Sequence, residues 1–233
     1  MMKVWGLWAT LAFAILAFLL GQAMASVATL AVVKSLNPAQ LDSNGTAVAI
    51  YTLVGNPVEI VTLVLATRLS GTDALAYLGL DIPRWRDVAI AAAGLLVVIA
   101  AADALTFALG KEMVPAFQIE WHRTARADGT LPWLWLAIIV AAPAGEELLF
   151  RGFLFRGFVH EPRDALPAII LIALIWSMLH VQYDSFGIAQ VFAIGVLFGF
   201  VRWRTGSTTL VILLHMLLNL ESMVETVIVM GWV

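Results

Sequence analysis

The stretch Ala141-Ala-Pro-Ala-Gly-Glu-Glu-Leu-Leu-Phe-Arg-Gly-Phe-Leu-Phe155 places two carboxylates and one arginine inside an apolar run long enough to cross a membrane. A charged side chain at the middle of a bilayer costs about 2.5 kcal/mol or more, so such residues face protein rather than lipid. Glu147 and Arg151 are four residues apart on one helix face, where their charges can neutralise each other. Glu146 lies about 100° further round the helix and therefore needs partners from another helix.

The composition of the whole chain is that of a helical membrane protein. Of the 233 residues, 62% are hydrophobic and 12% are charged, and the mean hydropathy is +0.95, a balance typical of chains that cross a membrane several times. Because the chain has no cysteine, a disulfide framework, a thiolate metal site and a cysteine nucleophile are excluded. The net charge of -3 comes with no basic run, so we expect no nucleic-acid partner.

Apolar runs of helical length alternate with polar connections along the chain. They cover residues 4–33, 46–69, 87–109, 132–158, 165–181, 187–203 and 208–229. We therefore expect an all-α fold, a polytopic integral membrane helical bundle of about seven transmembrane helices. We divide it into an N-terminal part of three helices with long connecting loops, residues 1–130, and a four-helix core, residues 131–233, that carries the polar stretch.

Lysine and arginine positions predict the orientation of these spans. If the N-terminus is cytoplasmic, the inner side carries Lys3, Arg68, Arg84, Arg86, Arg156, Arg163, Arg202 and Arg204. The outer side then carries Lys34, Lys111, Arg123 and Arg126. The excess on the inner side favours a cytoplasmic N-terminus, and it places the turns at 156–164 and 202–207 in the cytoplasm.

Two further regions allow alternative interpretations. In the second span, Gly55-Asn-Pro-Val-Glu59 sets a helix-breaking proline beside a carboxylate. Glu59 could belong to a substrate path, but we favour a polar residue that is satisfied by a neighbouring helix. In the longest loop, residues 111–131, Trp121 and His122 could contact a substrate, although a tryptophan at a membrane boundary is more often an anchor.

Four polar residues on three of the predicted helices lie at one depth: Glu146, His180, His215 and Asn219. At 1.5 Å per residue, all four fall roughly 15–27 Å from the boundary set by the two arginine-rich turns, near the middle of a hydrocarbon layer about 30 Å thick. His215 and Asn219 also share a helix face because they are four residues apart. These side chains can therefore converge on one site.

A carboxylate, two imidazoles and an amide at one depth suit the activation of a water molecule. A desolvated Glu146 can take a proton from water and return it to a leaving amine. His180 could share the water, while His215 and Asn219 could donate hydrogen bonds to a developing oxyanion. The same set could instead bind zinc through the glutamate and both histidines. The spacing leaves both chemistries open, and a single histidine in such a bundle is more often structural.

Three ordered motifs resemble the signature of the CPBP intramembrane protease family, which includes CAAX prenyl endopeptidases, bacteriocin-processing enzymes and relatives of lysostaphin resistance protein A. They are Glu146-Glu-Leu-Leu-Phe-Arg-Gly152, Trp176-Ser-Met-Leu-His180 and His215-Met-Leu-Leu-Asn219. The segment from Gly195 to Gly206 resembles the family's approach to its last motif. The resemblance covers residues 131–221, and the first three spans carry no recognisable family motif.

The resemblance implies an intramembrane endopeptidase in which Glu146 is the general base and His180 helps to activate the water. By the same resemblance, His215 and Asn219 form the oxyanion hole. Glu147 and Arg151 correspond to a supporting pair. Trp176 is also a supporting residue, at a position where the family commonly has phenylalanine.

The family has been described as metal-dependent, but its structures favour a glutamate mechanism, and we expect no required cofactor here. Asn219 is a poor zinc ligand and a good amide donor. The apolar sequence neighbours of His180 and His215 also offer few acceptors to orient metal-bound imidazoles. Zinc held by Glu146, His180 and His215 remains the alternative.

The resemblance implies that the partners are the lipid bilayer and a membrane-associated protein or peptide substrate. We expect an integral protein of the bacterial cytoplasmic membrane. Two other classes stay open: a non-proteolytic adaptor or immunity protein that keeps the motifs as a polar core, and a proton or small-solute transporter. The transporter alternative rests on ionisable residues in apolar runs, namely Glu59, Asp103, Glu221 and Glu225.

Overall fold

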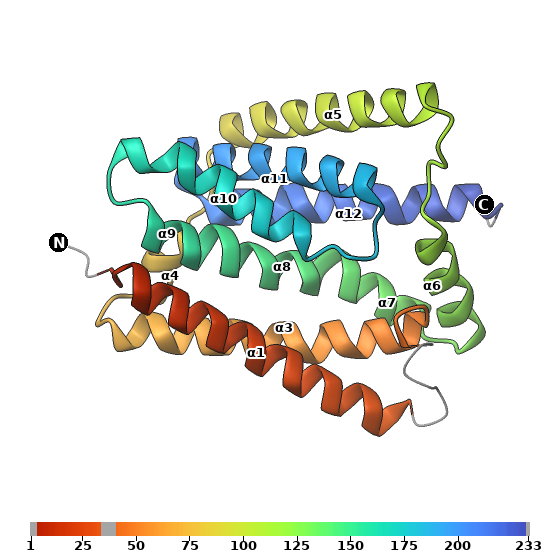
Figure 1. Cartoon of the computed structure of the whole chain (residues 1–233), viewed down its shortest axis with the longest axis horizontal. Helices are drawn as coiled ribbons and strands as arrows, with labels where there is room; N and C mark the ends of the chain where they lie inside the picture. The colour runs from red at the N-terminus through yellow and green to blue at the C-terminus, as the bar shows by residue number, and fades with distance from the viewer. Residues whose placement is uncertain (1–3, 34–40, 232–233) are drawn as a thin grey trace.

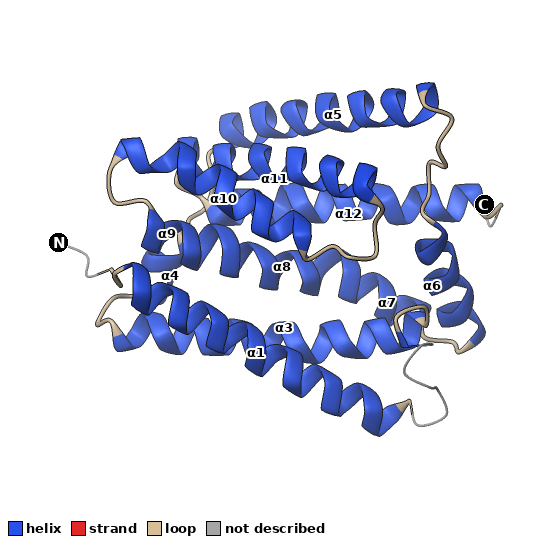
Figure 2. Ribbon diagram, viewed as in Figure 1, coloured by secondary structure: helices blue, strands red, loops and turns tan. Residues whose placement is uncertain are grey.

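The computed structural model describes residues 4–33 and 41–231, which form helices joined by short connections with no strand among them (Figure 1). Figure 2 shows the same helices coloured by secondary structure. The long helices are α1 (Leu7–Val32), α3 (Gly45–Leu69), α5 (Trp85–Ala108), α10 (Ala165–Met178), α11 (Ser185–Thr205) and α12 (Thr208–Val229). The predicted all-α fold is confirmed.

One further long helix is continuous from Leu131 to Phe158, although its geometry changes along its length. It consists of α7 (Leu131–Leu136), a π-helical segment (Ala137–Ala141), α8 (Ala142–Glu147), a second π-helical segment (Leu148–Leu154) and α9 (Phe155–Phe158). Pro143 explains the first π-helical segment, because a proline inside a helix has no N–H and its ring clashes with the carbonyl four residues earlier. The glutamate pair thus lies on a short α-helical segment between two π-helical ones.

Six helices of the described residues are long and apolar enough to cross a membrane. They match the predicted spans except the fifth, where α10 has 14 residues and ends before the expected Val181. This length corresponds to about 21 Å, against a hydrocarbon layer about 30 Å thick. The C-terminal end of α10 therefore lies well short of the end of the bundle that α12 reaches (Figure 1).

The two ends of the bundle are distinct. Helix α1 begins at one end, where the turns before α10 and α12 also lie, whereas α6 (Ala116–Ala127) and the C-terminal end of α12 lie at the other (Figure 1). The two arginine-rich turns therefore share one end, as the depth argument required. Their cytoplasmic orientation stays a prediction, and two of the basic residues counted for the two sides, Lys3 and Lys34, lie outside the described residues.

Helices α1 and α3 pack closely through small residues. A Cβ atom added to Gly21 would lie 2.9 Å from the carbonyl oxygen of Gly55 and 3.3 Å from Cβ of Glu59. Only a residue without a side chain fits this approach, as in other small-residue contacts between membrane helices. The contact holds α1 directly against the face of α3 that carries Glu59.

Two connections are more ordered than the sequence indicated. The connection between the second and third predicted spans contains α4 (Ala74–Leu78), where Tyr77 is fully buried and stacks on Phe153 at 5.6 Å between ring centroids. Residues 111–131, predicted as a loop, contain α6. This helix is fastened by hydrogen bonds from Gln118 Nε2 to Ser222 Oγ (2.7 Å) and from Trp121 Nε1 to the Asp42 carbonyl oxygen (2.8 Å).

Candidate active site

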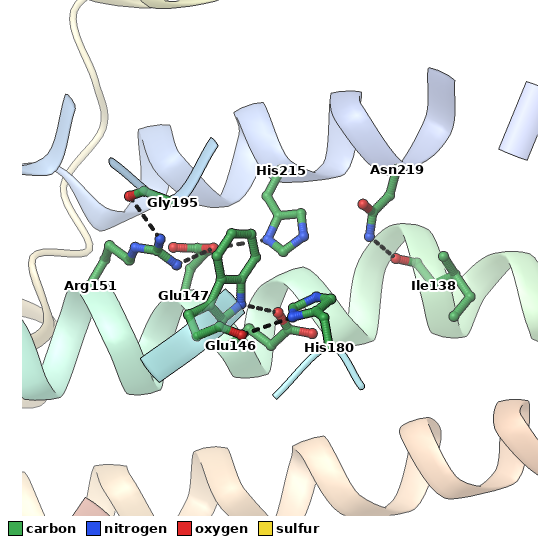
Figure 3. Close-up of polar contacts among 9 residues, drawn as sticks. Ile138, Glu146, Glu147, Arg151, His180, Gly195, His215 and Asn219 are labelled. Atoms are coloured by element: carbon green, nitrogen blue, oxygen red, sulfur yellow. Dashed lines mark hydrogen bonds and ion pairs between the residues drawn. The ribbon is translucent and has the colours of Figure 1, made fainter. Parts of the chain in front are cut away.

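Glu146 lies near the end of α8, and its carboxylate is fixed by a side chain from α10. Trp176 Nε1 donates a hydrogen bond of 2.6 Å to Glu146 Oε2 (Figure 3). Glu146 is only partly buried and lines a cavity on each of two sides. Its carboxylate is therefore oriented by protein and still accessible, and the expected partner from another helix is Trp176.

Trp176 also packs against three other groups of the site. Its ring centroid lies 4.9 Å from that of His180 and 5.5 Å from that of His215, both edge to face. The Arg151 guanidinium lies 4.6 Å from the ring centroid, at cation–π distance. Only 2% of Trp176 is exposed. A phenylalanine at this position would pack similarly but could not donate to Glu146.

Glu147 forms the centre of a closed cluster on the other side of the helix. Its Oε1 lies 3.1 Å from Arg151 Nη1 and 2.8 Å from His215 Nδ1, while Arg151 Nη2 donates to the Gly195 carbonyl oxygen at 3.1 Å (Figure 3). Glu147 and Arg151 are both fully buried. The predicted ion pair is confirmed, and it also orients His215, which the sequence did not indicate.

His180 follows the end of α10 and turns its ring back onto that helix. Its Nδ1 lies 2.9 Å from the Trp176 carbonyl oxygen, which also accepts a longer hydrogen bond of 3.3 Å from the Leu179 N–H at the end of α10. Because a carbonyl can only accept, Nδ1 carries the proton in this contact. Nε2 of a neutral His180 is then an acceptor.

Asn219 is fixed by a carbonyl group that the π-helical segment releases. The Ala142 N–H bonds to the Ala137 carbonyl oxygen, five residues earlier, so it does not reach Ile138. The next candidate donor, Pro143, has no N–H. The free Ile138 carbonyl oxygen instead accepts a hydrogen bond of 2.7 Å from Asn219 Nδ2 (Figure 3).

A cavity of about 250 Å³ brings the four predicted residues together. Its lining includes Glu146 from α8, His180 after α10, and His215 and Asn219 from α12. The predicted convergence is thus confirmed, while the catalytic roles stay predictions. We call this space the first cavity. It lies between α5, α6, α8, α11 and α12.

The first cavity has further polar lining residues, of which the sequence analysis singled out only the acidic ones. The lining includes Asp103, Gln118, Tyr183, Gln190, Glu221, Ser222 and Glu225. Burial, together with the nearby Glu146 carboxylate, raises the pKa of Tyr183 to about 12, so the phenol stays protonated and can donate a hydrogen bond. Gln118 and Gln190 could have been found as amides close to or inside apolar runs.

Glu59 differs from the expectation of a residue satisfied by a neighbouring helix. It is 5% exposed, and within the described part of the chain no hydrogen bond or ion pair reaches its carboxylate. It lines a second cavity, of about 300 Å³, which also contains Glu146 and His180. The preferred interpretation of Glu59 was therefore wrong.

The proposed zinc ligands do not fit a metal site in this arrangement. Among the described residues, no group of three histidine, aspartate or glutamate side chains is placed to hold a metal ion. Nδ1 of His215 faces Glu147, and Nδ1 of His180 faces the Trp176 carbonyl oxygen. The expectation that both histidines would have few acceptors to orient them was wrong, so that particular argument against zinc does not hold.

Comparison with known proteins agrees with the position and the kind of this site. Residues 128–220 match the family model for type II CAAX prenyl endopeptidase Rce1-like proteins. No curated protein and no solved structure matches the chain. The matched region contains all three motifs and coincides with the predicted range, whereas α1, α3 and α5 lie outside it. Residues 128–220 of this integral membrane protein therefore resemble the Rce1-like family of type II CAAX prenyl endopeptidases, which is consistent with an intramembrane protease of the CPBP type.

Proposed function

We propose that the protein is an intramembrane endopeptidase in which Glu146 activates the water that hydrolyses a peptide bond. The observation that carries this proposal is the first cavity, where an accessible carboxylate, fixed by Trp176, lies with His180, His215 and Asn219. Each of these side chains has one oriented contact to protein, and each still lines the cavity. Such preorganisation is what catalysis of hydrolysis requires.

The first step is attack by water on the scissile carbonyl carbon. Glu146 takes one proton from the water as the new C–O bond forms, and later returns this proton to the leaving nitrogen as the C–N bond breaks. His180 supports this step because its Nε2 can accept the second hydrogen of the same water while Nδ1 stays bonded to Trp176. The glutamate and the histidine then fix the water between them.

The second requirement is stabilisation of the oxyanion that forms on the carbonyl oxygen. Asn219 has a second N–H on Nδ2 besides the one bonded to Ile138, and this second N–H is available to the oxyanion. His215 can donate from Nε2 only as an imidazolium, because its Nδ1–H is already directed at Glu147. The buried Glu147 carboxylate stabilises that positive charge. Glu147 thus acts through His215 rather than on the substrate.

The proposed substrate is a membrane-associated protein or peptide, as the family and the membrane spans indicate. The first cavity is large enough for a few residues of an extended chain but not for a folded domain. We propose no resident metal, since the described residues offer no suitable ligand group. Every step above is assigned to side chains of this chain and to water.

Comparison of membrane proteomes tests this function in cells. A deletion strain is complemented with wild type, with Glu146→Gln, or with Glu161→Gln as a matched control, because Glu161 is exposed at the far end of the bundle. We expect the same set of uncleaved termini in the deletion and Glu146→Gln strains, and normal processing in the other two. Identical termini in all four strains would contradict proteolysis and favour a non-proteolytic adaptor.

A further inference from the structure

The second cavity, of about 300 Å³, lies between the site and the helices α1 and α3, and these two helices are outside the region that matches the family. Glu146, Trp176 and His180 line both cavities, so the reactive carboxylate faces the second cavity as well as the first. The other polar residues of its lining come mainly from α1 and α3, and they include Gln22, Tyr51, Thr52, Asn56 and Glu59. So many polar side chains around one cavity in a membrane protein indicate a polar occupant.

Glu59 shows most clearly what that occupant is. Unlike Glu147, which has a guanidinium and an imidazole, Glu59 is 95% buried without a hydrogen bond or ion pair from any described residue. A buried carboxyl group with no partner is strongly unfavourable. Buried waters normally satisfy such groups where the site is polar and has room for them. The second cavity meets both conditions.

The walls of this cavity are built by close packing. Gly21 lets α1 approach Gly55 and Glu59, as described above. On the other side, a Cβ atom at Gly145 would overlap Asn56 Oδ1, so this glycine lets α8 contact α3 one residue before Glu146. Tyr51 also donates a hydrogen bond to Gln22 Oε1 and joins α3 to α1. The space beside Glu59 is therefore held open by fixed contacts.

The exposed Gln182 connects this cavity with the surface. Gln182 lines the second cavity and follows the short helix α10. Because α10 ends well before α12 does, the connection after it is recessed within that end of the bundle (Figure 1). Gln182 and Glu146 line the same cavity, so the exposed amide gives water a polar contact at the edge of the space that contains Glu146.

Hydrolysis consumes one water in each turnover, and hydrocarbon supplies none. A peptide in the first cavity, with its carbonyl oxygen towards His215 and Asn219, covers that side of Glu146. We propose that the second cavity holds the water that Glu146 activates and that Glu59 is a positioning residue that binds this water. The inference rests on the proposed peptidase function. The oxygen of this water joins the carbonyl carbon, one of its protons passes through Glu146 to the leaving nitrogen, and another water refills the cavity.

Cysteine labelling tests whether the cavity is hydrated, independently of proteolysis. The native chain has no cysteine, so Asn56→Cys in the second cavity can be compared with Val61→Cys, which is 58% exposed on the same helix but outside the cavity lining. The protein is reconstituted into lipid vesicles with a small cationic methanethiosulfonate on both sides. Arg163→Cys, in an exposed turn, gives the rate for full exposure to water.

We expect Asn56→Cys to react within about tenfold of the Arg163→Cys rate, because the reagent enters a water-filled cavity. Val61→Cys should react at least about a hundredfold more slowly, because hydrocarbon surrounds it. These ratios follow from the exclusion of charged groups from hydrocarbon. An unreactive Asn56→Cys, or equal rates at positions 56 and 61, would overturn the inference whether or not the protein is a protease.

Kinetics of Glu59 variants on a verified substrate test the positioning role. Glu59→Leu should lower kcat by about tenfold or more while KM stays within about twofold, because substrate binding in the first cavity is intact. Glu59→Gln keeps the hydrogen bonds and should recover most of the lost turnover. A normal kcat in Glu59→Leu would overturn this role, as would an equal loss in both variants that follows a drop in thermal stability.

Failure of the water-cavity inference can be distinguished from failure of the proposed peptidase function. If wild type cleaves its substrate and Glu146→Gln does not, but position 56 is unreactive, only the water cavity is wrong. If position 56 reacts as expected but no cleavage depends on Glu146, the cavity is hydrated and the proposed function is wrong.

Discussion

Two adjacent glutamates occupy opposite environments in this protein. Glu147 is fully buried, bonded to Arg151 and His215, and separated from both cavities. Glu146 is partly buried, has one hydrogen bond from Trp176, and lines both cavities. A rotation of about 100° along the helix separates the two carboxylates. The comparison teaches that a buried carboxylate paired with a guanidinium and an imidazole supports structure, whereas a carboxylate with one fixed partner and an open side is available for reaction.

The largest expected effect comes from breaking the closed cluster. Arg151→Ala leaves Glu147 buried without its cation and should lower stability by about 3–5 kcal/mol. The melting temperature and the yield of folded protein in detergent measure this loss, with Arg163→Ala as an exposed control that should change neither. Unchanged thermal stability in Arg151→Ala would show that the closed cluster does not support the fold.

Substitution of Asn219 tests the proposed catalytic role of the residues that line the first cavity with Glu146. Asn219→Ala should lower kcat by roughly a hundredfold with little change in KM, because an oxyanion donor acts mainly in the transition state. The variant also frees the Ile138 carbonyl, which costs about 1 kcal/mol of stability, so melting temperatures are measured alongside kinetics. A change confined to KM would place Asn219 in ground-state binding instead.

A matched pair of glycines tests how closely α8 must approach α3. A Cβ atom at Gly145 would overlap Asn56, whereas a Cβ atom at Gly94 would have no neighbour within 4 Å. Gly145→Ala should therefore cost about 1–3 kcal/mol, while Gly94→Ala should gain about 0.5–1 kcal/mol from higher helix propensity. Thermal melting of both variants measures the difference. Equal effects would mean that α8 moves freely against α3.

The smallest expected effect is that of metal removal. Purified enzyme should keep its turnover through exhaustive chelation, because Glu146 acts as a base and not as a ligand. Elemental analysis and activity before and after chelation measure this directly. One tightly held zinc per chain, whose removal and return switch activity off and on, would make Glu146 a ligand and refute the glutamate mechanism.

The sequence predicted the helices well because apolar length and arginine-rich turns define membrane spans almost directly. Equal depth from shared turns also predicted that Glu146, His180 and His215 converge. The end of α10 was missed, because the apolar run continues to Val181 while the helix stops where His180 bonds the Trp176 carbonyl.

Other features depend on contacts between distant segments. The bond between Asn219 and Ile138 needs a π-helical segment that hydropathy does not reveal. The link from Glu147 to His215 joins residues 68 positions apart. The prediction that a neighbouring helix satisfies Glu59 came from the sequence of one span. That no described residue bonds its carboxylate is visible only once the packed neighbours are known.

The most direct test of the comparison measures turnover and melting temperature together for Glu146→Gln and Glu147→Gln on a verified substrate. We expect Glu146→Gln to melt like wild type and to lose at least about a thousandfold in kcat, because the shape is kept and the base is removed. Glu147→Gln should melt at a clearly lower temperature, because Arg151 loses its buried counter-charge. Near wild-type turnover in a correctly folded Glu146→Gln would contradict the account.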